Sequence, residues 1–356
     1  MADPAIQRAA LKGVLSLPRP LLRLLAGGGV VYRGGRTLDP RLQFLQWQAR
    51  GGPRFSQLTP PEARLVAAQL LKTYEAAPEP GVAVETLRLE TESGPIDARA
   101  YRPAVQDAAM PMLVFAHMGG GVLGDLDTAH GFCASLAAVA RGPVLNVAYR
   151  LAPEDRFPAG LDDVLAAYRW ALTHAGRFGA PAGVAAVGGD AMGGGFAAVI
   201  CQELRRHGEP QPALQLLINP VVDVASETGS MTTYADAWPL SRALTDWFLG
   251  HYLGPGDDPT DPRVSPLKAA DLSGLAPAVI ATAGFDPLVD QGEAYAKRLK
   301  EAGTDVAYRC YDGLSHGFAA FTGIVPAADA ACREIAQLAR EMVLKRAGQT
   351  TVGSGA

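Results

Sequence analysis

Apolar residues change their spacing along this chain, and each spacing predicts a different element. Residues 1–80 follow a helical pattern, with prolines in the first turn of a helix that starts near residue 59 and a stop at 77–80. We expect this part to be a helical appendage without a sheet. Over 84–101 the apolar positions alternate every second residue around a Ser-Gly turn, which predicts a half-exposed antiparallel hairpin.

Downstream of residue 110 the apolar runs become nearly continuous, as expected for parallel strands covered on both faces. Helical stretches separate them, so the pattern predicts a doubly wound, mostly parallel α/β sheet. The predicted strands are 112–116, 144–148, 184–187, 214–218, 279–283 and 306–311, and the predicted helices are 129–140, 161–174, 194–207 and 291–301.

One interval between predicted strands, 220–275, is too long for a plain connection. It holds an aromatic helix predicted at 237–253, with Trp238 and Phe248 among its large side chains. Long insertions in compact domains are usually functional. We therefore expect a lid-like insertion that governs substrate choice, with Trp238 and Phe248 contacting the substrate.

Composition and charge narrow the class of protein. The 356 residues are 48% hydrophobic and 19% charged, which excludes disorder of the whole chain. Lys and Arg number 32 against 36 Asp and Glu, for a net charge of −4, so nucleic acid is not an expected partner. No uncharged apolar run approaches the roughly 18 residues that span a bilayer, so membrane insertion is not expected, although contact with a membrane surface stays open.

The four cysteines are widely spaced, without a CxxC pair, and are expected to be buried free thiols. The first 31 residues lack a signal-peptide pattern, so we expect a cytoplasmic protein. No His, Cys, Asp and Glu cluster has ligand spacing, and neither a metal nor another cofactor is expected.

Two glycine-rich loops follow predicted parallel strands, where an α/β sheet places its chemistry. The first, 117–121 (His-Met-Gly-Gly-Gly), can present backbone N–H groups to an oxyanion, because no Cβ blocks the approach. The second, 188–195, has glycines two residues before and two after Ala191, which is the G-x-S-x-G spacing of a nucleophile elbow. A dinucleotide-binding loop fits it poorly, because the chain lacks an early βα unit there.

The elbow lacks its serine. Ala191 stands in that position, and its methyl group has neither a lone pair nor a proton to transfer. Downstream, Asp286 follows one predicted strand and His316 follows another. The order elbow, Asp, His is that of the α/β-hydrolase triad.

These motifs together resemble the hormone-sensitive-lipase family of bacterial carboxylesterases, within the α/β hydrolases. The resemblance covers roughly 84–344 and includes a Tyr-Arg-Leu-Ala-Pro-Glu stretch at 149–154. It implies a helical cap made of residues 1–51 and 222–263 on an α/β-hydrolase core made of 52–221 and 264–349. Residues 350–356 are expected to form a flexible tail.

The resemblance also implies a role for each site residue. Asp286 would orient His316, and His316 would act as general base and then as general acid. The N–H groups of Gly119, Gly120 and Met192 would form the oxyanion hole. Met118, Gly121 and Met192 depart from the family's usual residues, and all three are expected to reshape the acyl side of the pocket. The family often forms dimers, so a homodimer is expected.

Ala191 leaves two explanations open: a natural pseudoenzyme, or an engineered removal of the nucleophile. Every other catalytic element is intact, which favours the second. The expected function is hydrolysis of small to medium carboxylic esters, with Ala191 making this chain inactive. A non-catalytic small-ligand binding protein, and an amidase or lactonase with the same triad, are the alternatives.

Overall fold

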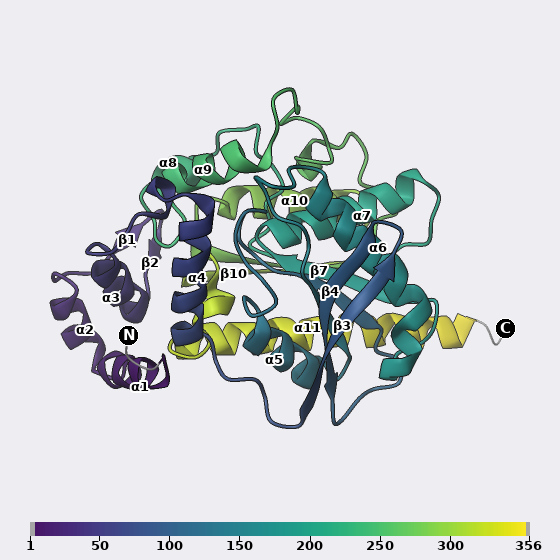
Figure 1. Cartoon of the computed structure of the whole chain (residues 1–356), viewed down its shortest axis with the longest axis horizontal. Helices are drawn as coiled ribbons and strands as arrows, with labels where there is room; N and C mark the ends of the chain where they lie inside the picture. The colour runs from purple at the N-terminus through teal and green to yellow at the C-terminus, as the bar shows by residue number, and fades with distance from the viewer. Residues whose placement is uncertain (1–3, 354–356) are drawn as a thin grey trace.

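The structure, a computed structural model, describes residues 4–353. Its centre is an eight-stranded sheet flanked on both faces by helices (Figure 1). The strands of this sheet are β3 (Val82–Thr91), β4 (Gly94–Pro103), β5 (Met112–Ala116), β6 (Val144–Val147), β7 (Ala185–Asp190), β8 (Gln215–Ile218), β9 (Ala278–Phe285) and β10 (Val306–Ser315). The helices are α1 (Pro4–Leu15), α2 (Arg19–Leu25), α3 (Pro40–Ala49), α4 (Pro60–Tyr74), α5 (His130–Ala140), α6 (Ala159–His174), α7 (Met192–Arg206), α8 (Gly229–Thr233), α9 (Arg242–Tyr252), α10 (Val289–Glu301) and α11 (Pro326–Gly353).

The order of strands in the sheet is β10-β9-β8-β7-β5-β6-β4-β3. From β6 to β10 all neighbours are parallel, whereas β4 is antiparallel to both β3 and β6. The predicted hairpin and the predicted doubly wound sheet are therefore confirmed. The carboxyl ends of β5, β7, β9 and β10 meet at one edge, and the loops that leave them carry the site.

Alternate side chains of β5 show how the sheet is buried on both faces. Met112 and Val114 belong to one core, which also contains the buried faces of α6 and α7. Leu113 and Phe115 belong to a second core, which contains the buried faces of α5 and α11. Burial on both faces explains why the strand is apolar at every position.

The N-terminal part is not purely helical, so that expectation was wrong. β1 (Tyr32–Arg33) and β2 (Arg36–Thr37) form a two-stranded antiparallel ribbon. Gly34 and Gly35 have φ of 55° and 79°, as a two-residue hairpin turn requires. Each strand is only two residues long, too short for alternation to reveal it.

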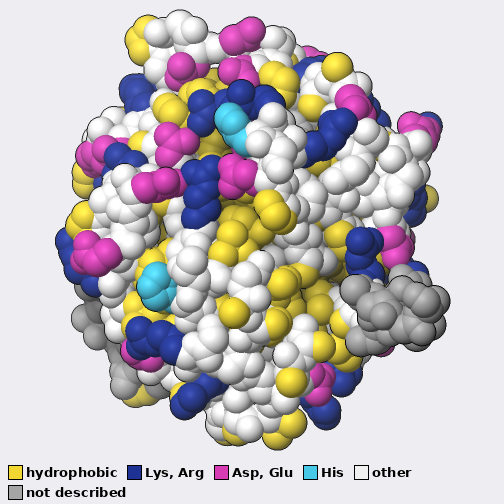
Figure 2. All heavy atoms as spheres, turned by 90° about the vertical axis from the view of Figure 1, so that its right-hand side faces the viewer, with side chains coloured by type: hydrophobic (Ala, Val, Ile, Leu, Met, Phe, Trp, Pro, Cys, Tyr) yellow, Lys and Arg dark blue, Asp and Glu magenta, His cyan; other side chains and the backbone are white. Residues whose placement is uncertain are grey.

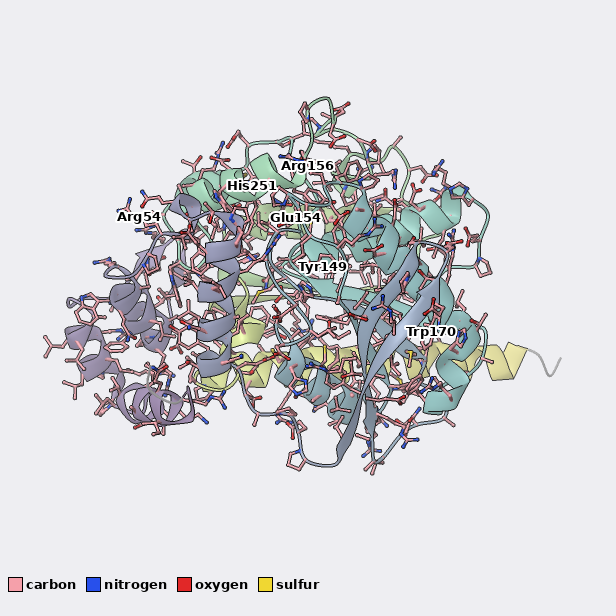
Figure 3. All side chains as sticks on the ribbon, in the orientation of Figure 1. Arg54, Tyr149, Glu154, Arg156, Trp170 and His251 are labelled. Atoms are coloured by element: carbon pink, nitrogen blue, oxygen red, sulfur yellow. The ribbon has the colours of Figure 1, made fainter. Side chains whose placement is uncertain are left out.

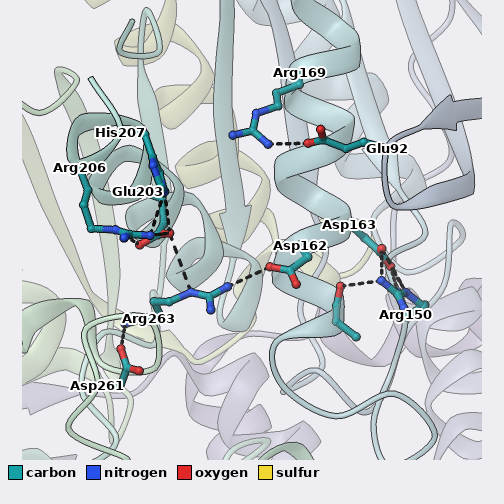
Figure 4. Close-up of polar contacts among 11 residues, drawn as sticks. Glu92, Arg150, Asp162, Asp163, Arg169, Glu203, Arg206, His207, Asp261 and Arg263 are labelled. Carbon is teal, nitrogen blue, oxygen red and sulfur yellow. Dashed lines mark hydrogen bonds and ion pairs between the residues drawn. The ribbon is translucent and has the colours of Figure 1, made fainter. Parts of the chain in front are cut away.

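The insertion also differs in detail from the prediction. It contains two helices, and the aromatic one, α9, begins at Arg242 rather than at residue 237. Ser241 caps it, because its hydroxyl accepts a hydrogen bond from the N–H of Leu244 at 3.2 Å. At the end of the insertion, Arg263 binds Asp162 of α6 at 2.9 Å and approaches Glu203 of α7 at 4.0 Å (Figure 4).

A carboxyl group is buried between the end of α4 and the start of α5. Glu75, which follows α4, is buried and accepts a hydrogen bond from the N–H of Phe132 in the first turn of α5 at 3.1 Å. Burial raises the pKa of this carboxyl to about 8.

The segment expected to be a flexible tail, 350–356, is helical to Gly353, and its last three residues lie outside the described residues. Across 4–353, no helix combines the length and the apolar character that crossing a membrane would need.

Candidate active site

Ala191 lies in the tight turn between β7 and α7. Its backbone has φ 52° and ψ −113°, a conformation that residues other than glycine rarely adopt, and its side chain is buried. Such a conformation costs on the order of 1–3 kcal/mol and persists only where the surrounding structure holds it. The strain points to a functional position, because an alanine in an ordinary turn would not need it.

The glycines on either side of this turn allow the close approach that it demands. A Cβ at Gly189 would overlap the backbone of Gly193, and a Cβ at Gly193 would overlap the carbonyl of Ala116 on β5. Both positions therefore exclude any larger side chain. This is the local geometry of a nucleophile elbow.

Asp286 and His316 come from the ends of β9 and β10 and meet in a buried pair. His316 Nδ1 lies 2.7 Å from Asp286 Oδ2, and Asp286 Oδ1 accepts a hydrogen bond from the N–H of Leu288 at 2.8 Å. Burial alone would lower the pKa of His316, but the charge and the hydrogen bond of Asp286 outweigh it, so the pKa is raised. This pairing orients the ring and leaves Nε2 available for proton transfer.

The loop after β5 is the candidate oxyanion hole. Gly119, Gly120 and Gly121 all have positive φ, of 127°, 63° and 73°. A Cβ at Gly119 would overlap the carbonyl of Leu123, so the loop depends on glycine there. Met192 is the first residue of α7, where backbone N–H groups have no partner within the helix.

His117, at the start of this loop, is a second buried histidine near the site. Its Nδ1 lies 2.8 Å from the carbonyl oxygen of Met118, and its ring stacks on Tyr149 with the centroids 4.3 Å apart. Burial lowers its pKa to about 4, so the ring is neutral. Within residues 4–353 no carboxylate pairs with His117 as Asp286 does with His316, and the ring supports the loop.

The insertion covers this loop with α9. The ring of Phe248 contacts Gly120 so closely that any Cβ there would overlap it, and a Cβ at Gly121 would lie 2.7 Å from Tyr252. Trp238, ahead of α9, packs on Phe321 with the ring centroids 5.3 Å apart. The structure thus brings Phe248 to the oxyanion loop, and Trp238 to the short helix at Phe318–Phe321 that follows His316.

The two methionines singled out in the sequence both lie at the site. Met118 is partly buried, and a Cβ added at Gly317 would lie 3.1 Å from its Sδ. Met192 is buried beside Ala191 at the start of α7. Met118 therefore contacts the loop of His316, and its effect on the pocket stays a prediction.

Asp190 is a site residue that the sequence analysis did not single out. Its carboxyl is buried directly before Ala191 and accepts a hydrogen bond from Asn219 Nδ2 at 3.3 Å. Burial, together with the charge of Asp286, raises its pKa to about 6, against the opposing effects of His316 and Asn219. Its position within the elbow motif, directly before Ala191, is the sequence signal that could have identified it as a site residue.

Arg64 of α4 is another such residue, and it holds the two loops beside the elbow. Its Nε donates to the carbonyl of Val122 at 2.8 Å, and its Nη2 donates to the carbonyl of Ala152 at 2.8 Å. Both nitrogens of its fork bind the carboxylate of Glu154, at 2.9 and 2.7 Å. Since Val122 directly follows the glycines of the oxyanion loop, Arg64 is a positioning residue for that loop.

A second arginine connects the same region to α9. Arg156 Nη1 donates to the carbonyl of Gly250 at 3.2 Å and also to that of Leu253, at the C-terminal end of α9. Figure 3 shows Glu154 and Arg156 close to the helix that carries His251. The loop that follows β6 therefore joins α4, the oxyanion loop and α9.

Among residues 4–353, no group of three or more His, Cys, Asp or Glu side chains is placed to hold a metal ion.

Comparisons with known proteins agree with this geometry. The family of proteins with the alpha/beta hydrolase fold matches residues 113–320. The carboxylic ester hydrolase LipN of Mycobacterium tuberculosis is 44% identical over 310 residues, which cover 85% of this chain and 82% of LipN. The ethyl acetate hydrolase of Pseudomonas putida is 38% identical over 250 residues, covering 69% of this chain and 79% of that enzyme.

Solved structures give the same result. A serine-to-alanine mutant of LAE6, an α/β hydrolase from the metagenome of Lake Arreo in Spain, superimposes with a TM-score of 0.80 at 41% identity, covering 84% of this chain and 95% of that one. The ester hydrolase EH1AB1 from the same metagenome, bound to a bipyridine phosphonate derivative, has a TM-score of 0.80 at 40% identity and covers 84% of this chain and 96% of its own. The chain belongs to the α/β hydrolase family, in the branch whose relatives are bacterial carboxylic ester hydrolases.

Proposed function

We propose that this chain is a serine carboxylic ester hydrolase whose nucleophile position, residue 191, is occupied by alanine. The observation that carries the proposal is the strained elbow at Ala191 beside the buried pair of His316 and Asp286. Nothing in a plain binding site would require both features together. The names of LipN and of the ethyl acetate hydrolase support esters as the substrate class.

The reaction follows from the site with a serine hydroxyl at residue 191. His316 Nε2 takes the hydroxyl proton while the oxygen attacks the ester carbonyl, and Asp286 stabilises the imidazolium. The N–H groups of Gly119, Gly120 and Met192 stabilise the oxyanion. The tetrahedral intermediate collapses, the alkoxide takes the proton from His316, and the acyl group stays on the serine.

Hydrolysis of the acyl-enzyme repeats these steps with water as the nucleophile. His316 removes a proton from the water, the oxyanion forms in the same hole, and the acid leaves as the serine oxygen regains its proton. The contact of Phe248 with Gly120 leaves little space over the loop that would bind the ester carbonyl, which supports small to medium esters. In this proposal residues 1–51 and 222–263 act as the cap.

Ala191 removes the bond-forming oxygen and leaves the rest of the site in place. The intact pair and the intact loop support an engineered substitution over a natural loss of function, because a chain without catalytic selection is expected to lose further elements. Esters of the parent enzyme should therefore still bind to this chain and be recovered intact, with affinities in the micromolar to millimolar range typical of KM values.

The experiment is to make Ala191→Ser and assay short p-nitrophenyl esters against this chain and against Ala191→Gly as a matched control. We expect a gain of at least about three orders of magnitude in turnover for Ala191→Ser alone. Adding His316→Ala should remove that gain. Unchanged turnover on a broad panel of esters would refute the proposal, and activity confined to amides or lactones would replace esters as the substrate class.

The proposal also includes a cytoplasmic location and a homodimer. Cys133, Cys201, Cys310 and Cys332 are free thiols, which supports a reducing compartment such as the cytoplasm. A homodimer is proposed on the family resemblance alone, and sedimentation velocity would measure it.

A further inference from the structure

Large apolar side chains are exposed mainly at the N-terminal end of the molecule. Within residues 6–348, whose side chains the structure describes, seven of the eleven large hydrophobic residues that are exposed precede residue 50. We call five of them the N-terminal patch, and their exposed fractions run from 40% to 69%: Leu21, Leu24, Leu25, Val30 and Trp47.

Local packing gathers these residues around one turn. The ring of Trp47 lies 3.9 Å from where a Cβ of Gly27 would stand, directly after α2. Gln43 Nε2 donates to the carbonyl of Gly29 at 3.2 Å and holds the same turn against α3. In Figure 1, α1, α2 and α3 form the end of the molecule opposite the C-terminus of α11.

The same end carries a net positive charge, in contrast to the rest of the protein. Residues 1–54 contain nine Lys and Arg but only two Asp, a net charge of +7, whereas the whole chain has −4, so the remaining residues carry −11. By contrast, the face in Figure 2, at the other end of the long axis, shows basic and acidic side chains mixed.

Some of these basic side chains have partners within the protein, and others do not. Arg33 pairs with Asp236, Arg36 pairs with Asp312, and Arg41 donates to the carbonyl of Leu15. Five others have no ion-pair partner among the described residues: Lys12, Arg19, Arg23, Arg50 and Arg54.

We propose that the N-terminal patch docks on the surface of an anionic phospholipid bilayer, with its apolar side chains in the headgroup region and the unpaired basic side chains on lipid phosphates. Clusters of Lys and Arg beside exposed Leu and Trp are what such a surface attracts. A second copy of the chain is the poorer occupant, because a two-fold contact would place two surfaces of the same positive charge face to face. The docking is peripheral and needs no helix that spans the bilayer.

The test uses this chain as it is, with Ala191, so ester hydrolysis does not enter and the two proposals fail independently. Binding is measured by co-sedimentation with vesicles of phosphatidylcholine containing 30% phosphatidylglycerol and with vesicles of phosphatidylcholine alone. We expect binding to the anionic vesicles that falls steeply as salt shortens the Debye length from about 10 Å at 0.1 M to about 3 Å at 1 M. Brominated lipids should quench tryptophan fluorescence, and Trp47→Phe should remove that quenching.

Paired variants separate the patch from the general charge of the chain. Lys12→Glu with Arg19→Glu should weaken binding by about tenfold or more, and Leu24→Ser should also weaken it. The matched controls are Arg102→Glu and Val105→Ser, which are exposed outside the patch. Equal binding of all these variants, absence of binding at low salt, or a dimer that Leu24→Ser dissociates would each overturn the proposal. Circular dichroism of each variant verifies that it is folded.

Discussion

Replacing Arg64 by alanine tests whether one side chain of α4 holds the loops beside the elbow. The carbonyls of Val122 and Ala152 belong to fully buried residues and would lose the donors that now lie 2.8 Å away. A buried carbonyl left without a partner costs about 1–3 kcal/mol. The ion pair with Glu154, whose side chain is 54% exposed, adds only about 0–1 kcal/mol.

We therefore expect Arg64→Ala to lower the free energy of unfolding by about 3 kcal/mol, most of it from the two carbonyls. Urea unfolding followed by circular dichroism measures this. Arg88→Ala is the matched control, because Arg88 pairs with Asp97 on the surface at 3.0 Å. It should change the free energy of unfolding by less than about 0.5 kcal/mol. Arg64→Lys should recover only part of the loss, because one ammonium group cannot reproduce the planar fork.

The same variant should also affect the reaction. On the Ala191→Ser background, Arg64→Ala should lower kcat by about tenfold with a smaller change in KM, because the misplaced N–H groups act on the transition state. A structural role alone would lower stability and leave the kcat of the folded fraction unchanged. If Arg64→Ala matches Arg88→Ala in both stability and kcat, Arg64 does not hold the oxyanion loop in position, and the reasoning is refuted.

Three further predictions follow from charges and contacts at the site and in the fold. The kcat/KM of the Ala191→Ser form should fall on acidification with a midpoint above about 6.5, because His316 must be neutral and its pKa is raised; a flat profile from pH 5 to 9 would contradict this. Glu75 must stay protonated up to about pH 8 in the folded chain while the unfolded chain ionises near 4.5. Its contribution to stability is thus complete below pH 4.5 and declines up to pH 8, so Glu75→Gln should gain stability relative to the parent over that window, by about 5 kcal/mol at most. An equal difference in urea titrations at pH 5 and 8 would refute this. Phe248→Ala should raise kcat/KM for bulky acyl esters relative to acetates, and an equal change for all esters would mean that Phe248 only supports the fold.

The sequence revealed those parts of the site that depend on neighbours along the chain. The elbow could be predicted because the glycines at 189 and 193 lie two residues from Ala191, and their need for space is local. Asp286 and His316 could be placed because each follows an apolar run, and the ends of parallel strands converge. The fold class was predictable for the same reason, since burial on both faces leaves a continuous apolar pattern.

Contacts between distant segments left no such pattern. Arg64 binds carbonyls that lie 58 and 88 residues away, and a carbonyl has no sequence signature. The contact of Phe248 with Gly120 likewise depends on how α9 packs over the loop. The start of α9 is different, because Ser241 is a local capping signal that could have corrected the predicted boundary.

Covalent labelling by a fluorophosphonate ester tests the central claim most directly, because the reagent bonds only to an activated nucleophile. Intact mass and peptide mapping would be compared for this chain, for Ala191→Ser and for Ala191→Ser with His316→Ala. The account predicts one adduct per chain in Ala191→Ser, located at residue 191, strongly slowed by His316→Ala and absent from this chain. An adduct on this chain, or an adduct elsewhere in Ala191→Ser, would show that residue 191 is not the position of the nucleophile.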